Sequence, residues 1–299
     1  MSEPTPPPER APQSGGPYLL DPRPSRHRER SRRLITRAAD LATPDRAALL
    51  GAGECDEIPL EEMVARFKQI TLNDLETAPL ERALGQAHLD AAARATLAIC
   101  IADLTGVTDS LLTGIQKAIV EETTAAEAIE AMATVVEHPP EHEFPRPLRG
   151  PFDLVVASCV LSQLHFALVH RGAALFEQKF SGQIETLRAS PRWAGAVYAL
   201  ARTMETNFMT DLAGITLPGG VVYLSESVQM CYLRAAPDGK WQSEGTYRML
   251  RSTELADYLD QRFEVIARDR WDWVVSPPTI ETPTGRLYDV QAIVARRSE

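Results

Sequence analysis

The stretch from residue 46 to residue 74 most constrains the fold, because strand-like and helix-like patterns alternate within it. An apolar run at 47–50 enters a turn of small residues, Gly51-Ala52-Gly53. A helix-like pattern follows over 59–67, with apolar residues at i, i+3, i+4 and i+7. A second strand-like run, 68–74, ends on an acid, Asp74. This order predicts a parallel α/β sheet in which the small-residue loop lies against a ligand.

The rest of the chain continues the same alternation. Further strands are expected at 96–102, 152–157, 221–225, 263–267 and 287–295, and helical segments at 77–87, 109–137, 166–212 and 252–261. The near-continuous apolar run at 96–102 suits a sheet that is covered on both faces. The last two strands are joined without a helical pattern, which predicts an antiparallel pair at the end of the sheet. Residues 166–212 are more than a crossover needs, so we expect a helical insertion or lid there.

The N-terminal region differs in composition from the rest. Residues 1–24 are rich in proline and are expected to form a disordered arm. Residues 25–42 are expected to form a basic cap helix, and residues 43–299 the main domain. Seven arginines against two acids give residues 21–37 a net charge of +5. A solvated basic face is preferred for this helix over a phosphate or RNA contact.

Charge and cysteine usage exclude several classes of protein. The net charge is −10, so the chain beyond residue 37 carries −14 and is a poor nucleic-acid binder. The four cysteines are far apart, which suggests neither a zinc site nor disulfides. Prolines 139 and 140 deny His138 and His142 a shared helical face, so no metal site is expected. No run is apolar enough to span a bilayer, and a cytoplasmic protein is expected.

The ordered elements resemble the class I S-adenosylmethionine-dependent methyltransferases. The resemblance covers roughly residues 40–297 and rests on five segments in order: LLGAGECDEIPL, ITLNDLE, IADLTGV, FDLVVASCVLSQL and LPGGVVYLSE. It implies a Rossmann-like, seven-stranded, mostly parallel sheet with an antiparallel last strand, helices on both faces and a helical insertion after the fourth strand. It also implies S-adenosyl-L-methionine as the cofactor.

The resemblance assigns expected roles to residues at the strand ends. The cofactor-binding candidates are Gly51, Ala52 and Gly53 for the methionine part and ribose, Asp74 with Leu75 for the ribose hydroxyls, Asp103 with Leu104 for adenine, and Ser158 and Cys159 beside the methyl-transfer site. Each also has a structural alternative. The glycines could form a packing turn, Asp74 a helix cap, and Asp103 an Asx turn before Thr105.

One departure from a dinucleotide fingerprint discriminates between cofactors. Asp56 stands where GxGxxG requires glycine, and its carboxylate would repel a pyrophosphate. S-adenosylmethionine has no phosphate and carries positive charge. The acidic loop with Glu54, Asp56 and Glu57 therefore disfavours a nicotinamide-dependent oxidoreductase and suits this cofactor.

The acceptor side is less constrained by the sequence. Candidates for polar or catalytic roles are Gln163, His165 and Glu226, with a core histidine and a salt bridge as the structural alternatives for the last two. Cys55 and Cys159 have no partner nearby in sequence and are interpreted as small fillers. The NPPY or DPPY signature of nucleic-acid amino-methylating enzymes is absent.

A small-molecule acceptor is therefore expected, with O-methylation slightly favoured over N- or C-methylation. The alternative is a catalytically degenerate, methyltransferase-like binding or regulatory protein. A homodimer is possible.

Overall fold

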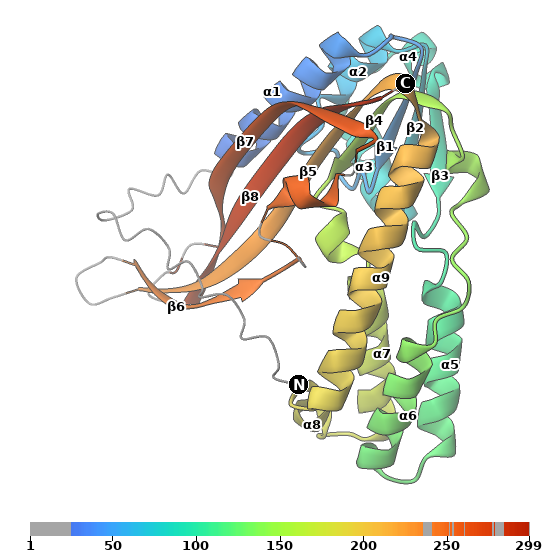
Figure 1. The fold of residues 1–299 in the computed structure, drawn as a ribbon, viewed down its shortest axis with the longest axis vertical. Coiled ribbons are helices and arrows are strands. Elements are labelled where there is room, and N and C mark those ends of the chain that lie inside the picture. The colour runs from blue at the N-terminus through green and yellow to red at the C-terminus, as the bar shows by residue number, and fades with distance from the viewer. Residues whose placement is uncertain are drawn as a thin grey trace.

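The fold is built on a mixed sheet with a mostly parallel centre. The computed structural model describes residues 25–235, 241–250, 252, 254–259, 261–276, 278 and 284–298. Seven of its eight described strands follow the order β3-β2-β1-β4-β5-β8-β7, and the eighth, β6, pairs with β5 beside this path (Figure 1). The strands are β1 (Arg46–Leu50), β2 (Gln69–Asp74), β3 (Leu97–Ile101), β4 (Phe152–Ser158), β5 (Thr216–Ala235), β6 (Trp241–Arg248), β7 (Phe263–Ser276) and β8 (Thr284–Arg297).

The strand directions confirm the predicted Rossmann-like sheet. Strands β3, β2, β1, β4 and β5 are parallel to one another, whereas β8 is antiparallel to both β5 and β7. Almost every residue of β1 and β4 is buried, as the apolar runs predicted for strands covered on both faces. Since β1 lies between β2 and β4, the order of the strands reverses at β1.

Helices cover both faces of this sheet. The helices α1 (Ser25–Leu41), α2 (Leu60–Arg66) and α3 (Thr77–Gln86) share one core with the strand residues Leu49, Leu72 and Val156. The strand residues Ala48, Val155 and Leu224 face the other core, which is formed with the later helices. The remaining short helices are α4 (Ala91–Ala95), η1 (Arg146–Leu148), η2 (Leu161–Gln163) and η3 (Leu255–Tyr258).

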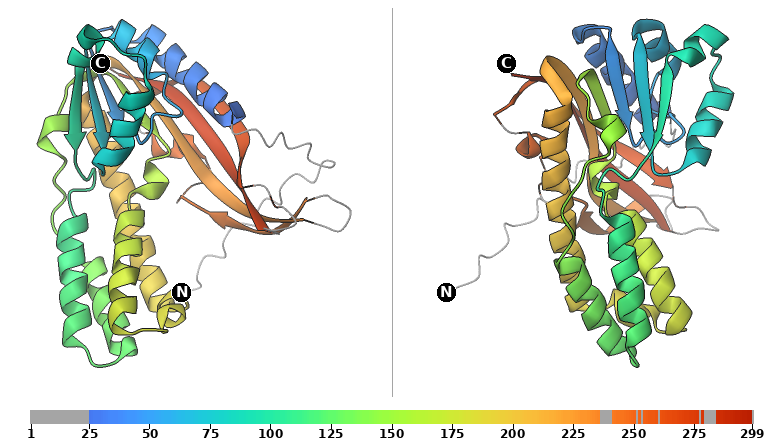
Figure 2. Two further views of the ribbon diagram at one scale, coloured as in Figure 1. Left: turned by 180° about the vertical axis from the view of Figure 1, so that it is seen from behind. Right: turned by 90° about the vertical axis from the view of Figure 1, so that its right-hand side faces the viewer.

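A helical bundle lies beyond the carboxyl ends of the central strands (Figures 1 and 2). It consists of α5 (Thr108–Glu121), α6 (Ala125–Glu137), α7 (Phe166–Lys179), α8 (Ile184–Arg188) and α9 (Pro191–Ile215). Helix α5 packs against α6 and α7, and α6 packs against α9. The sequence predicted an insertion only after the fourth strand, but the β3–β4 connection contributes two of the helices.

The helical segment expected at 109–137 is broken in the structure. Thr124 accepts a hydrogen bond from the backbone N–H of Glu127 at 3.3 Å, and the Glu127 carboxylate accepts one from the Thr124 N–H at 3.2 Å. This reciprocal capping box starts α6 and lets the chain turn back on α5.

The C-terminal part contains a strand and an arm that the sequence did not predict. Strand β5 runs far beyond the expected 221–225 and pairs with both β8 and β6. We call residues 228–235, 241–248, 272–276 and 284–289 the arm; it extends to one side of the sheet in Figure 1. The α-helix expected at 252–261 is wrong, because the described residues of this range form only the short 3-10 helix η3.

Helix α1 lies across the sheet and contacts β4, β5, β7 and β8 (Figure 2). Its residues Leu34, Ile35 and Ala38 are buried. Its basic face is not simply solvated, because Arg30 and Arg33 pair with Asp269 of β7 at 3.2 and 3.0 Å. The N-terminal segment at 1–24, for which the sequence predicted a disordered, proline-rich stretch, lies outside the described residues. Among the described helices, none has the length and apolar character needed to cross a membrane.

Candidate functional site

A cleft of about 410 Å³ opens at the carboxyl ends of β1, β2 and β4, which is a volume typical of small-molecule sites. Its lining combines the loop after β1, the segment after β4 and the inner face of the arm: Gly51, Ala52, Gly53, Glu54, Asp56, Glu57, Ile58, Asp74, Ser158, Cys159, Ser162, Gln163, Phe166, Ser227, Met249, Trp273, Val275 and Tyr288. Ligands of open α/β sheets bind where the strand order reverses, and this cleft lies there.

The glycines of the loop after β1 are required by its geometry. Gly51 has φ +58° and Gly53 has φ +52°, in the left-handed region that favours glycine. A Cβ on Gly51 would lie 2.8 Å from Val160 Cγ2, whereas a Cβ on Gly53 would meet open space. Gly51 is thus fixed by packing, while Gly53 presents bare backbone at the cleft.

Asn73 and Asp74 hold this loop in place. The backbone oxygen of Asn73 accepts from the Ala52 N–H at 2.8 Å, and Asp74 Oδ2 accepts from the Gly53 N–H at 2.8 Å. Asn73 is fully buried, and its side-chain amide donates to the backbone oxygens of Cys100 and Ala102. The sequence analysis missed Asn73; an amide directly before the acid that ends β2 was the available signal.

Asp103 makes the hydrogen bonds expected of the structural alternative, an Asx turn before Thr105. Its carboxylate accepts hydrogen bonds from the Thr105 N–H at 2.9 Å, the Thr105 hydroxyl at 2.7 Å and the Thr108 N–H at 3.0 Å. These bonds form an Asx turn and cap the start of α5. Neither Asp103 nor Leu104 is among the residues that line the cleft. The expected contact of these two residues with adenine stays a prediction.

Two apolar side chains beside Asp74 are exposed instead. Leu75 follows Asp74 and is 45% exposed. Ile101, the Cα partner of Asp74 in the β2–β3 pairing, is 44% exposed. An apolar surface therefore adjoins the carboxylate that ends β2.

The segment after β4 contributes Ser158 and Cys159 to the cleft. The Ser158 hydroxyl hydrogen bonds to the Glu57 carboxylate and lies 3.0 Å from the Ser225 hydroxyl. Cys159 has φ +54°, and its N–H donates to the Ser225 backbone oxygen at 2.8 Å. Burial, together with the nearby Glu57 and Glu226, raises the pKa of the Cys159 thiol well above its usual value. Cys159 is therefore a poor nucleophile, as the sequence analysis expected.

Of the three acceptor-side candidates, Gln163 alone lines the cleft. Its side-chain amide donates to the Cys159 backbone oxygen at 2.7 Å. His165 precedes α7 with its ring edge against Phe166, and burial lowers its pKa.

Glu226 is fully buried in β5 and is not part of the cleft lining. Its Oε2 accepts from the Ser162 N–H at 3.2 Å, while Oε1 has no hydrogen-bond partner among the described residues. Burial raises the pKa of Glu226 to about 8, so the protonated carboxyl is favoured at neutral pH. Its placement suits anchoring the segment that carries Ser162.

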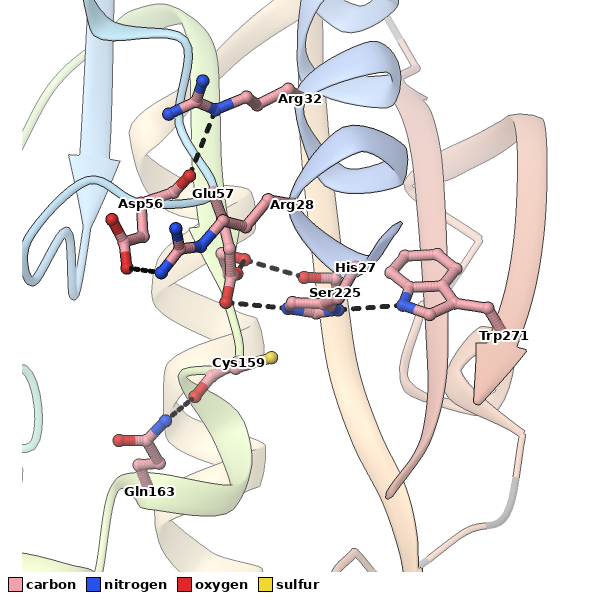
Figure 3. A network of polar contacts seen from close by, with 10 residues as sticks. His27, Arg28, Arg32, Asp56, Glu57, Cys159, Gln163, Ser225 and Trp271 are labelled. Atoms are coloured by element: carbon pink, nitrogen blue, oxygen red, sulfur yellow. Dashed lines mark hydrogen bonds and ion pairs between the residues drawn. The ribbon is translucent and has the colours of Figure 1, made fainter. Parts of the chain in front are cut away.

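Two of the three carboxylates in the loop after β1 are paired with arginines, which the sequence did not predict. Glu54 pairs with Arg82 at 2.8 Å, and Asp56 pairs with Arg28 of α1 and accepts from Arg32 through its backbone oxygen (Figure 3). Glu57 instead contacts His27, whose Nε2 lies 2.8 Å from Oε1. Two of the three carboxylates are thus neutralised within the chain.

The opposite wall of the cleft is apolar and largely aromatic. It is formed by Phe166 of α7, by Trp273 and Val275 of β7, by Tyr288 of β8 and by Met249. Phe166 and Val275 are 36% and 37% exposed, which is high for such side chains in a folded domain. Among the described lining residues there is no lysine, arginine or histidine.

No protein-family model and no curated protein sequence matches the chain. Solved structures do match in fold, including the N-methyltransferase NodS from Bradyrhizobium japonicum WM9, with 13% identity over 91% of this chain and 96% of that one and a TM-score of 0.44. An S-adenosylmethionine-dependent methyltransferase from Mesorhizobium loti matches with 10% identity over 89% and 98% of the two chains and a TM-score of 0.42. Another from Clostridium acetobutylicum matches with 11% identity over 91% and 92% and a TM-score of 0.37. At these identities and scores, the function has to be argued from the site itself.

Proposed function

We propose that this chain is an S-adenosylmethionine-dependent methyltransferase that acts on a small molecule. The observation that carries the proposal is the convergence of the Gly51–Gly53 loop and Asp74 in one cleft, at the point where the strand order reverses. A bare backbone loop and a carboxylate on the neighbouring strand are the two groups that a ribose-containing ligand needs there.

The residues present fit this cofactor. Gly53 offers backbone without a side chain, Asp74 is half-buried with acceptor positions left for ribose hydroxyls, and Leu75 and Ile101 offer apolar surface for a base. Glu57 adds a negative charge for the cationic end. A dinucleotide fits less well, because the described lining has four carboxylates and no basic side chain to meet a pyrophosphate.

When bound, the cofactor supplies a methyl group activated by a positively charged sulfur. The chain's own part is to orient the acceptor and to exclude water, which are the main protein contributions to such a transfer. Gln163 and Ser162 supply polar contacts, and Phe166 and Trp273 supply an apolar wall. Neither His165 nor Glu226, the two sequence candidates for a general base, is among the lining residues of the cleft.

The lining also narrows the acceptor. Because all ionisable groups of the described lining are acidic or thiol side chains, an anionic acceptor such as a phosphate or carboxylate would be repelled. Nothing basic in this lining stabilises an oxyanion, which favours an amine over a hydroxyl and reverses the preference drawn from the sequence. We therefore propose an acceptor without negative charge that has an apolar or aromatic part and, where it is an amine, reacts through an unprotonated nitrogen.

Calorimetric titration tests the cofactor assignment. We expect the full chain to bind S-adenosylmethionine and S-adenosylhomocysteine and to show no measurable binding of NADH under the same conditions. Absence of binding by both sulfur ligands would refute the proposal. Transfer of a labelled methyl group to a panel of aromatic amines, phenols and carboxylates then tests the acceptor class. Cofactor binding without transfer to any acceptor would favour a binding or regulatory role.

A further inference from the structure

Helix α1 places the side chain of His27 against two residues that line the cleft, Glu57 and Trp273. His27 is 3% exposed, and three contacts fix its ring. Its Nε2 lies 2.8 Å from Glu57 Oε1, and its Nδ1 lies 2.8 Å from Trp271 Nε1 (Figure 3). The ring also stacks on Trp273, with centroids 3.9 Å apart and planes 5° from parallel. Both the position and the orientation of the imidazole are therefore set.

The contact with Trp271 also sets the tautomer of His27. An indole N–H only donates, so Nδ1 of His27 must accept and cannot carry a proton. The neutral ring then has its proton on Nε2, and this nitrogen lies 2.8 Å from Glu57 Oε1. A doubly protonated ring would lose the bond from Trp271, which is costly at a buried site. In the neutral tautomer, His27 faces Glu57 with its N–H and adds no positive charge.

The surroundings keep Glu57 ionised. Burial opposes its ionisation, but the contact with His27, the hydrogen bond from Ser158 and the nearby positive charge of Arg28 outweigh that cost, so the pKa of Glu57 is lowered. The nearest other titratable groups are Cys159 and Tyr223, whose pKa values burial raises, and Arg28, which pairs with Asp56. Glu57 therefore presents a net negative charge beside the cleft, with its side chain 19% exposed.

The same geometry argues against a metal at this position. Ligand atoms of His27, Glu57 and Cys159 lie within 4.8 Å of one another, as a metal site would require. A metal on Nε2 would force the proton onto Nδ1, where the Trp271 N–H already points. Two donors would then face each other in a buried position, so the hydrogen-bonded network is the favoured state.

We propose that His27 is a positioning residue that holds Glu57 as an ionised carboxylate for the cationic end of the cofactor, so that α1 is part of the cofactor site. This inference rests on the methyltransferase function proposed above. Among the cleft carboxylates, Glu54 and Asp56 have arginine partners and Asp74 accepts from loop amides. Glu57 is the one whose described hydrogen-bond partners carry no charge.

The tautomer can be measured without any cofactor. Nitrogen-15 NMR of the imidazole should show His27 protonated on Nε2 and unprotonated on Nδ1 at neutral pH. In Trp271→Phe, which keeps an aromatic ring but removes the donor, the tautomer with the proton on Nδ1 should become populated. A protonated Nδ1 in the unmodified protein would overturn the inference and leave the proposed function standing.

The affinity for S-adenosylmethionine then measures how His27 affects the Glu57 carboxylate. Affinity for S-adenosylmethionine should change less than about 3-fold between pH 6 and pH 8 in the unmodified protein. In Trp271→Phe it should fall at least about 10-fold at both pH values, because the tautomer with the proton on Nδ1 leaves no donor on Nε2 for Glu57. His27→Gln, which can still donate, should retain affinity at both pH values, whereas His27→Ala should lose it at both.

Arg33→Gln on the exposed face of α1 is the matched control and should behave as the unmodified protein. Equal affinity of His27→Ala and the unmodified protein, both folded by circular dichroism, would overturn the positioning role. No binding by the unmodified protein, together with the expected NMR result, would place the failure in the proposed function, on which this inference depends.

Discussion

Replacing Asp74 by alanine should weaken binding of S-adenosylhomocysteine about 10- to 100-fold. The carboxylate ends β2, lines the cleft and is the acceptor that we assign to the ribose hydroxyls. Hydrogen bonds to a charged group contribute about 1.5–3 kcal/mol, and each 1.4 kcal/mol corresponds to about a factor of ten. The variant also loses the bond that fixes the Gly53 N–H, so the true loss should lie toward the upper end.

Asp103→Ala is the matched comparison, because it removes a carboxylate from the end of the neighbouring strand. Asp103 caps the turn into α5 through Thr105 and Thr108. Losing such a cap costs about 0.5–2 kcal/mol of stability. We expect a lower midpoint of thermal unfolding in this variant, with ligand affinity within about 3-fold of the unmodified protein.

Isothermal titration calorimetry and thermal unfolding, run on both variants, separate the two roles. Unchanged affinity in a folded Asp74→Ala protein would show that Asp74 does not hold the ligand. A loss of affinity in Asp103→Ala as large as in Asp74→Ala would show instead that the adenine contact implied by the family resemblance is real, and that the capping bonds in the structure understate what Asp103 does.

Three further predictions follow from burial and capping. Folding raises the pKa of Glu226 from 4.5 to about 8, so the unmodified protein should lose stability relative to Glu226→Gln as the pH rises from about 4.5 to 8. Chemical denaturation of both proteins at several pH values measures this loss. A difference in unfolding free energy that stays constant with pH would contradict the raised pKa. Titration with a thiol reagent should modify Cys231 rapidly in the native protein and spare the buried cysteines. Burial raises the pKa of Cys55, for example, to about 12. Rapid reaction of more than one thiol would refute this prediction. Thr124→Ala should lower the free energy of unfolding by about 1 kcal/mol through loss of the α6 capping box, whereas the exposed Thr113→Ala should change it much less.

Local patterns in the sequence predicted the centre of the sheet closely. The apolar runs of β1 and β4 identify buried parallel strands, since such strands must present apolar side chains to both faces. The run at 96–102 predicted a buried strand as well, but β3 is an edge strand of the described sheet, and of its residues only Cys100 is buried. The same reasoning missed β6, because most of its residues are exposed and form no apolar run. It also failed at the turn between α5 and α6, although the Thr124–Glu127 spacing of a capping box was there to be read.

The candidate site divides in the same way. Gly51, Gly53 and Asp74 could be predicted because backbone conformation and strand-end position are local properties. Asp103 could not be assigned, because an Asx turn and a ligand contact require the same residue in the same place; its three hydrogen bonds favour the turn.

The sequence by itself determined a parallel sheet with a small-residue loop and an acid at the end of the next strand, since hydrophobic periodicity and glycine conformation act over a few residues. Only the tertiary structure decided which charges face the cleft. Arg28 of α1 reaches Asp56, and His27 reaches Glu57, across about thirty residues of intervening chain. Trp271 of β7, far later in the chain, orients that histidine. The net charge of the cleft and the tautomer of His27 depend on such contacts between residues far apart in the sequence. The reason is that the strength of an electrostatic interaction is set by the distance between the groups in space and by their burial from water.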